Sequence, residues 1–227
     1  AGERLFPLTK ERAKPAVYFG GPYRIIDFVL SNCINSGLRR IFIATQYKSL
    51  SLNRHIRMGW SIVSEELGEF VEILPPQKRV SEHWYQGTAD AVRQSLRHIE
   101  PFSSEYVLIL SGDQLYQMDF MEMLKNHIER KADISIATIP VAEREASEFG
   151  IMKKNADGII TSFIEKPKKE VLGDWVSDTG KEMKRMKRDY LASMGIYIFN
   201  RKLLFELLND ECKEATDFGK EIIPHFA

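Results

Sequence analysis

One acidic residue ends an apolar run in the segment Tyr106-Val-Leu-Ile-Leu-Ser-Gly-Asp113. Residues 106–110 are apolar and are followed by small turn formers, a pattern that predicts a strand buried on both faces of a parallel sheet. Ligands of open α/β sheets bind beyond the carboxyl ends of the strands, so Asp113 is expected at a position suited to metal or phosphate chemistry. An Asp that only caps the following turn is the alternative, and this segment alone does not decide between them.

A second candidate is the opening segment AGERLFPLTKERAKPAVYFGG, which combines Gly2, Arg4 and Lys14. Glycine lets the backbone approach a phosphate closely, and Arg and Lys donate hydrogen bonds to it. A solvated basic loop would have the same composition.

A third candidate is WYQGTAD, residues 84–90, which leads into the amphipathic segment TADAVRQSLRHI. Thr88 is the expected N-cap of this helix, and Gly87 precedes it. The N–H groups of a helix N-terminus can hold a base or a phosphate, although an ordinary capped helix would look the same.

A fourth candidate is Glu165-Lys166-Pro167, where a strand-like run ends. Alternation would send Glu165 and Lys166 to opposite faces, but Pro167 stops the strand, so both side chains can turn into one crevice. Lys donates to phosphates and Glu accepts from sugar hydroxyls. A surface ion pair is the alternative.

The elements that must position these residues alternate along the chain. Strand-like runs cover residues 41–45, 70–74, 106–110, 134–139, 159–164 and 194–199, and helix-like segments cover 27–36, 88–99, 120–129 and 202–208. This alternation predicts an α/β fold with a doubly wound, mostly parallel sheet. The polar stretch 166–188 is expected to be an insertion or lid between two strands.

Composition excludes several classes of protein. The 227 residues carry 32 basic and 32 acidic side chains, so no broad charge favours nucleic acid or a membrane surface. No run approaches the roughly 20 apolar residues of a membrane helix. Two isolated cysteines, Cys33 and Cys212, fit a reducing compartment such as the cytoplasm. The motifs GxxxxGK[ST], GxGxxG, HExxH and GxSxG are absent.

Taken in order, the motifs resemble the catalytic, Rossmann-like (GT-A-like) nucleotidyltransferase domain of the glucose-1-phosphate adenylyltransferase (ADP-glucose pyrophosphorylase) family. The matching segments are GERLFPLTKERAKPAVYFGG, YRIIDFVLSNCINSG, ATQY, WYQGTADAV, LSGDQLY, FGIM, IEKP, ASMGIYIF and DFGKEIIP. The resemblance covers nearly all of residues 1–227 and implies one such domain. It also implies that ATP and α-D-glucose 1-phosphate give ADP-glucose and pyrophosphate with Mg²⁺, in glycogen or starch synthesis.

The resemblance also implies residue roles. Asp113 would hold the catalytic Mg²⁺, and Arg4 and Lys14 would contact the nucleotide phosphates. The other implied nucleotide-binding residues are Gly2, Gln77, Gly87 and Thr88, and the implied glucose 1-phosphate-binding residues are Tyr85, Gly150, Glu165, Lys166 and Ser193. The implied assembly is an allosteric cytoplasmic homotetramer.

The sequence departs from the family pattern at several places. The family's first strand and the leading glycines of its first loop are expected before Ala1, and Glu3 replaces the usual Thr. A second metal-binding Asp and a C-terminal left-handed β-helix domain are expected beyond Ala227, so this chain alone is expected to be inactive. Pro22 replaces an activator-binding Lys, which argues against sugar-phosphate activation at that position.

Two other functions stay open. One is a regulatory subunit of the same enzyme that leaves catalysis to a partner, although retention of Asp113, Lys166 and Arg4 favours catalysis. The other is a nucleotidyltransferase for a different base or sugar phosphate. Trp60 and Trp84 are expected near the nucleotide crevice, with a core or interface role as the alternative.

Overall fold

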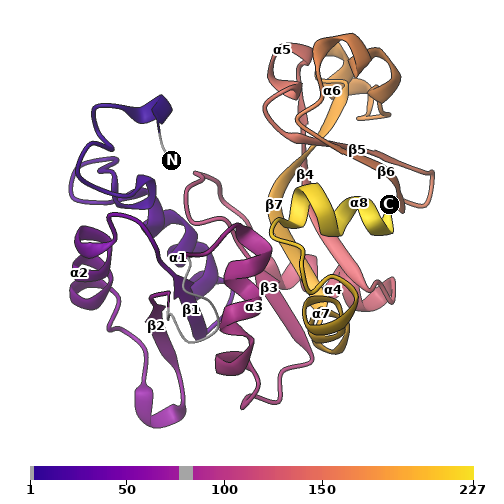
Figure 1. Cartoon of the computed structure of the whole chain (residues 1–227). Coiled ribbons are helices and arrows are strands. Elements are labelled where there is room, and N and C mark those ends of the chain that lie inside the picture. The colour runs from indigo at the N-terminus through magenta and orange to yellow at the C-terminus, as the bar shows by residue number, and fades with distance from the viewer. Residues whose placement is uncertain (1–2, 77–83) are drawn as a thin grey trace. The chain divides into compact units, whose positions relative to one another are not determined.

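The computed structural model describes residues 3–76 and 84–227, which form two compact units (Figure 1). Within the described residues, the first unit contains the chain up to Tyr85, Gln94–Phe102 and Leu110–Ala132, and the second contains Gln86–Arg93, Ser103–Ile109 and Asp133–Ala227. The chain therefore passes between the units several times, and helix α3 (Thr88–Ile99) contributes to both.

The first unit is built on a parallel pair of strands, β1 (Arg40–Ala44) and β2 (Phe70–Leu74), paired from Arg40↔Phe70 to Ala44↔Leu74. Its other helices are α1 (Ile25–Asn35), α2 (Leu50–Gly59) and α4 (Phe120–Glu129). Helix α1 begins where Asp27 accepts a hydrogen bond from the Arg24 backbone N at 2.7 Å, which satisfies a donor at the helix start. The buried core consists of Ala16, Ile26, Val29, Leu30, Leu52 and Ile56, with Tyr116 and Leu110 among the residues packed against it.

The second unit contains a five-stranded sheet in which β7 (Tyr190–Asn200) is the central element. The strand order is β3 (Tyr106–Ile109), β7, β5 (Gly150–Lys154) and β6 (Ile160–Glu165), and β4 (Ile134–Val141) also pairs with β7. Each of these pairs is antiparallel. In the β5–β6 turn the Asn155 side chain accepts hydrogen bonds from the backbone N of Asp157 and Ile159, at 3.0 and 2.9 Å.

Short helical segments complete both units. The first unit has 3-10 turns η1 (Glu3–Leu5), η2 (Lys14–Ala16) and η3 (Glu65–Leu67). The second has α5 (Glu143–Ala146), η4 (Lys169–Trp175), α6 (Lys181–Arg185), α7 (Arg201–Glu206), the π-helical η5 (Leu207–Glu211) and η6 (Phe218–Ile222), and α8 (Ile223–Phe226). The polar stretch 166–188 does lie between two strands, β6 and β7. Its Leu172 is buried in a core cluster of the second unit, together with Val141, Ala146, Ile151, Tyr190 and Ala192.

The α/β class is confirmed, but the described strand pairing differs from the expected, mostly parallel arrangement. Parallel pairing occurs in β1–β2, whereas the ladders around β7 are antiparallel. Strand β3 is half-buried and pairs with an antiparallel neighbour, so the prediction that 106–110 is buried on both faces of a parallel sheet was wrong. An apolar run carries no information about the direction of the strand beside it.

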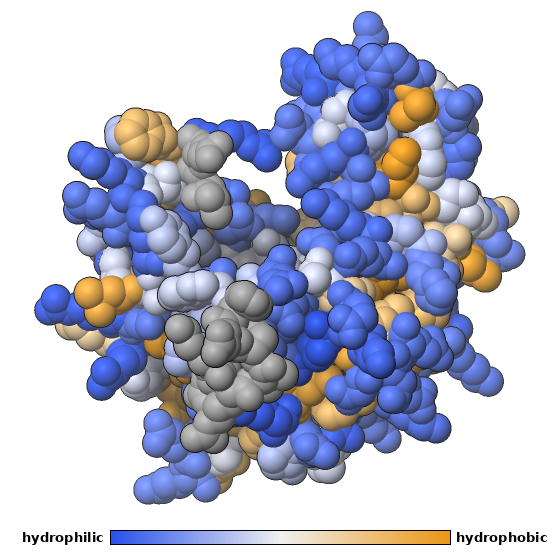
Figure 2. All heavy atoms as spheres, in the orientation of Figure 1, coloured by the Kyte–Doolittle hydropathy of each residue, from blue (hydrophilic) through white to orange (hydrophobic). Residues whose placement is uncertain are grey.

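Several element bounds were predicted correctly and others were missed. The helices at 88–99 and 120–129 begin and end where the sequence pattern placed them, as does the strand at 70–74. Helix α2 and strand β5 were not predicted. Figure 2 shows mainly hydrophilic side chains on the visible face. No helix within the described residues is long and apolar enough to cross a membrane.

Candidate functional site

Asp113 lies in the first unit, in a turn four residues beyond β3. Its Oδ2 atom accepts a hydrogen bond from Lys14 Nζ at 2.8 Å, and its Oδ1 atom accepts one from Ser111 Oγ at 2.6 Å. The two partners of the ion pair are 34% and 36% exposed, so the pair faces solvent but is partly enclosed. The structure thus brings together two of the predicted catalytic residues from positions 99 apart in the chain.

The environment of Asp113 keeps its carboxyl group ionised. Burial alone would raise its pKa, but the hydrogen bonds from Lys14 and Ser111 and the positive charge of Lys14 together hold the pKa below its ordinary value. The result is an anion beside a cation at the surface of the unit, an arrangement suited to binding a metal ion and a phosphate at adjacent positions.

Other residues were predicted near the nucleotide phosphates. Arg4 lies exposed in the 3-10 turn Glu3–Leu5. Gly2 and Gln77 lie outside the described residues. Trp84 is 56% exposed, whereas Trp60 packs against the first core and donates from Nε1 to Asp27 Oδ1 at 2.7 Å. Trp60 therefore has the core role that was its alternative.

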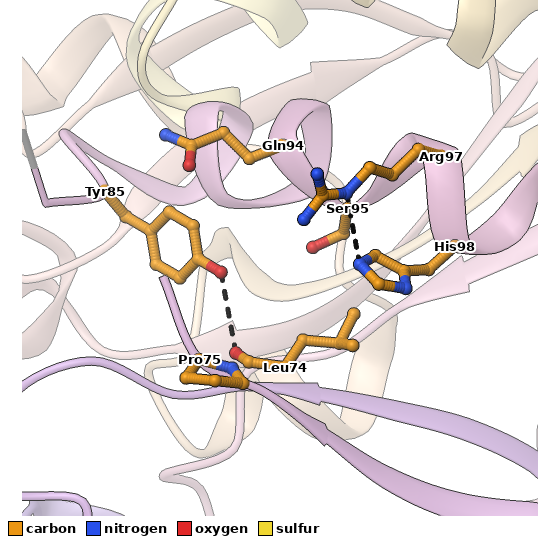
Figure 3. A pocket seen from close by; sticks show the side chains of 7 residues that line it. All are labelled: Leu74, Pro75, Tyr85, Gln94, Ser95, Arg97 and His98. Carbon is orange, nitrogen blue, oxygen red and sulfur yellow. Dashed lines mark hydrogen bonds between the residues drawn. The ribbon is translucent and has the colours of Figure 1, made fainter. Parts of the chain in front are cut away.

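Tyr85 lines a small pocket at the carboxyl end of β2, and Figure 3 shows its ring directed toward that strand. Its hydroxyl donates to the Leu74 carbonyl oxygen at 3.5 Å, the long limit of a hydrogen bond. The lining residues are Leu74, Pro75, Tyr85, Gln94, Ser95, Arg97 and His98. Tyr85 belongs to the first unit, whereas the other four residues predicted to bind glucose 1-phosphate belong to the second.

The N-cap of α3 differs from the sequence prediction, although the helix bounds do not. Thr88 is the first residue of the helix and not its N-cap. The Thr216 carbonyl oxygen accepts hydrogen bonds from the backbone N of Ala89 and Asp90, at 2.9 and 3.2 Å. Two N–H groups expected to be free for a phosphate are thus already satisfied, because a distant segment of the chain reaches the helix end.

Gly87 and Thr88 make this contact possible. A Cβ atom on Gly87 would lie 2.3 Å from the Thr216 carbonyl oxygen, so a side chain there would displace the backbone of that segment. Thr88 Oγ1 accepts from the Phe218 backbone N at 3.1 Å and lies 3.4 Å from Asp217 Oδ2, to which it donates. Both residues therefore hold the segment 216–218 against α3.

A second cluster surrounds the end of β6. Glu165 and Lys166 form an ion pair of 3.6 Å, and Lys166 has a φ of 48°, a left-handed conformation that turns the chain out of the strand. This ion pair is the alternative that the sequence left open, and the prediction that both side chains turn into one crevice stays a prediction. Lys166 is 56% exposed, so its ammonium group reaches solvent.

Two glycines shape the space around the Glu165 carboxylate. A Cβ on Gly150 would lie 2.7 Å from Glu165 Oε2 and 2.3 Å from the Phe163 ring, and a Cβ on Gly219 would lie 3.0 Å from Glu165 Oε2. The absence of side chains at Gly150 and Gly219 therefore leaves room for the Glu165 carboxylate. Ser193, on β7, is buried and its Oγ accepts from the Gly195 backbone N at 3.2 Å.

Comparison with known proteins places the chain in a family. The sequence profile of a family described as Nucleotidyl transferase matches residues 1–227. The chain belongs to the nucleotidyl transferase family. This membership is consistent with the Rossmann-like α/β fold class.

Three similar curated proteins are each named glucose-1-phosphate adenylyltransferase. This chain is 53% identical over 228 residues to the glucose-1-phosphate adenylyltransferase of Koribacter versatilis (strain Ellin345), a match that covers 99% of this chain and 52% of that protein. It is 51% identical to the proteins of the same name from Yersinia pseudotuberculosis serotype O:1b (strain IP 31758) and Yersinia pestis (strain Pestoides F). Those matches cover 98% of this chain and 51% and 46% of the relatives. The chain thus spans about half the length of the curated relatives it matches.

Nucleotidyl transferases of this type generally use Mg²⁺. The described residues fit a Mg²⁺ ion that is bound by one protein carboxylate, not by a cluster of protein ligands. Among the residues that the structure describes, no group of three or more His, Cys, Asp or Glu could hold a metal ion. Mg²⁺ commonly binds one or two carboxylates together with substrate phosphates. Asp113 supplies one ionised, partly exposed carboxylate, so this chain fits a Mg²⁺ ion that is held jointly with a substrate.

Sequence reasoning did not single out Asp217 or Tyr197 in this nucleotidyl transferase. Asp217 Oδ1 accepts from the backbone N of Gly219 and Lys220, at 2.9 and 3.1 Å, beside the Glu165 carboxylate. Burial raises the pKa of Tyr197, while its hydrogen bond with Ser193 acts in the opposite direction. Both residues lie within matching motifs, DFGKEIIP and ASMGIYIF, so those motifs held the signal.

Proposed function

We propose that the protein to which this chain belongs transfers adenylate from ATP to α-D-glucose 1-phosphate, giving ADP-glucose and pyrophosphate. The observation that carries the proposal is the Lys14–Asp113 pair at 2.8 Å, in a chain about half identical to proteins named for this reaction. An ionised carboxylate beside an ammonium group matches the needs of a metal–polyphosphate complex. A cytoplasmic homotetramer is part of the same proposal, by resemblance to the family.

Lys14 and Arg4 would bind the phosphates of ATP, and Asp113 would hold Mg²⁺. The metal ion, when bound, would neutralise charge that develops on the phosphate oxygens. Gly2, Gln77, Gly87 and Thr88 would shape the adenylate site, with Gly87 and Thr88 acting through the docked segment 216–218. Lys14 can turn from Asp113 toward a phosphate because it is partly exposed.

The acceptor substrate would bind at the second cluster. Lys166 would donate to its phosphate and Glu165 would accept from its sugar hydroxyls, while Gly150 and Ser193 would shape the pocket. A phosphate oxygen of glucose 1-phosphate would attack the α-phosphorus of ATP in line, so the protein need not supply a nucleophile. Catalysis would then consist of positioning and charge neutralisation.

The test is pyrophosphate release by the natural gene product that contains this chain, with Mg²⁺. We expect ATP to be preferred to GTP, CTP, UTP and dTTP, and glucose 1-phosphate to be preferred to galactose 1-phosphate and mannose 1-phosphate. Activity with another nucleotide or sugar would support a different nucleotidyltransferase. Binding of ATP without release of pyrophosphate from any pair would support a regulatory subunit and contradict the proposal.

A further inference from the structure

The segment that carries Asp113 has no regular structure of its own. Residues 110–119 belong to no helix or strand, but the segment contacts α1 at more than one point. Before Asp113, a Cβ on Gly112 would lie 3.2 Å from Ile26 Cδ1, so the backbone at Gly112 packs against α1. A carboxylate in such a segment needs contacts from elsewhere to hold it in one position.

Those contacts come from Asn32 in α1 and from Ser36, the residue that directly follows the helix. Asn32 donates from Nδ2 to the Tyr116 carbonyl oxygen at 2.9 Å and accepts at Oδ1 from the Met118 backbone N at 3.3 Å. One turn further along, Ser36 Oγ accepts from the Phe120 backbone N at 2.9 Å. Asn32 and Ser36 are 7% and 6% exposed, so both side chains are largely shielded from water.

The helix itself does not explain an asparagine at this position. Asn is one of the weaker helix formers, and a buried amide is costly unless its donor and acceptor are both satisfied. The Asn32 amide donates to one backbone carbonyl and accepts from one backbone N–H. These two hydrogen bonds take the place of those that a neighbouring strand would make with the segment. Contacts with α1 thus lie on both sides of Asp113, at Gly112 and at Tyr116–Met118.

We propose that Asn32 and Ser36 are positioning residues that fix the Asp113 carboxylate by holding the segment after it on α1. The proposal rests on the function proposed above, in which Asp113 holds Mg²⁺. All of these residues belong to the first unit. Release of the segment would let Asp113 move relative to Lys14 and weaken its hold on a metal ion.

The test compares Asn32→Ala with Asn35→Ala in the natural gene product. Asn35 is an exposed residue at the end of the same helix, so it controls for the loss of an amide from α1. The measurements are kcat, the KM for glucose 1-phosphate, the Tm, and the affinity for Mn²⁺ measured by electron paramagnetic resonance with α,β-methylene-ATP bound. The Mn²⁺ measurement reports the metal site without turnover.

We expect Asn32→Ala to lower kcat by roughly 10- to 100-fold and to weaken Mn²⁺ binding, because displacement of a catalytic group by about 1 Å can cost 10²-fold. The KM for glucose 1-phosphate should change by less than about twofold, because most of the residues proposed to bind glucose 1-phosphate belong to the second unit. Asn35→Ala should match the wild-type protein.

A lowered Tm with wild-type kcat and Mn²⁺ affinity per folded molecule would overturn the proposal, since it would make the contact purely structural. If Asn32→Ala does not fold, Ser36→Ala removes a single hydrogen bond and should lower kcat by about 2- to 10-fold. A folded Ser36→Ala variant with wild-type kcat and Mn²⁺ affinity would then reject the proposal. An inactive wild-type protein would instead reject the proposed function.

Discussion

Substitution of Asp113 by Asn should separate catalysis from stability. The change keeps the size of the side chain, removes its charge and leaves Lys14 Nζ without its partner at 2.8 Å. Because the two side chains are 34% and 36% exposed, loss of the ion pair should cost at most about 1 kcal/mol of folding free energy. For a chain of 227 residues that corresponds to a fall in Tm of roughly 2–4 °C or less.

The effect on the reaction should be much larger. A carboxylate that holds a metal ion at a reacting phosphate contributes several kcal/mol to transition-state stabilisation. A loss of about 3–5 kcal/mol lowers the rate by roughly 10²- to 10⁴-fold. The assay is Mg²⁺-dependent pyrophosphate release by the natural gene product, with thermal unfolding measured on the same samples.

The matched control is Asp174→Asn, which makes the same chemical change at an exposed position in η4. It should leave both rate and Tm unchanged. Near-normal pyrophosphate release by Asp113→Asn would refute the metal role of this carboxylate. A fall in rate no greater than the fraction of protein that unfolds would refute it as well.

Three further predictions concern the second cluster and the effect of pH. Gly150→Ala should lower the free energy of unfolding in urea by about 1–3 kcal/mol, because its Cβ would overlap the Phe163 ring, while Gly173→Ala, with open space around it, should be neutral. Lys166→Ala should raise the KM for glucose 1-phosphate more than that for ATP, and Lys169→Ala should change neither; a raised KM for ATP alone would move Lys166 to the nucleotide site. The folded pKa of Asp113 is lowered, so its stabilising contribution should be complete above about pH 5 and should fade as pH falls through the folded pKa. Urea unfolding of the wild-type protein and Asp113→Asn from pH 7 to pH 3 measures this, and a constant difference between them would contradict it.

The candidate site was partly predictable because its key residues follow local signals. Asp113 stands after an apolar run, and Lys166 stands before a proline that ends a strand. Those signals correctly indicated that Asp113 and Lys166 each lie just beyond the end of a strand. They did not reveal the partner of Asp113, since Lys14 lies 99 residues away. They also did not reveal that the Thr216 carbonyl oxygen binds the N-terminus of α3.

Local patterning alone gave the bounds of α3, α4 and β2, since hydrophobic periodicity and turn residues act over a few positions. The direction of strand pairing around β7 emerged only from the path of the folded chain. The same is true of the amide of Asn32, whose role is visible only where Tyr116 and Met118 meet α1. A hydrogen bond between distant residues depends on where the backbone travels, and one residue's type records only that it can donate or accept.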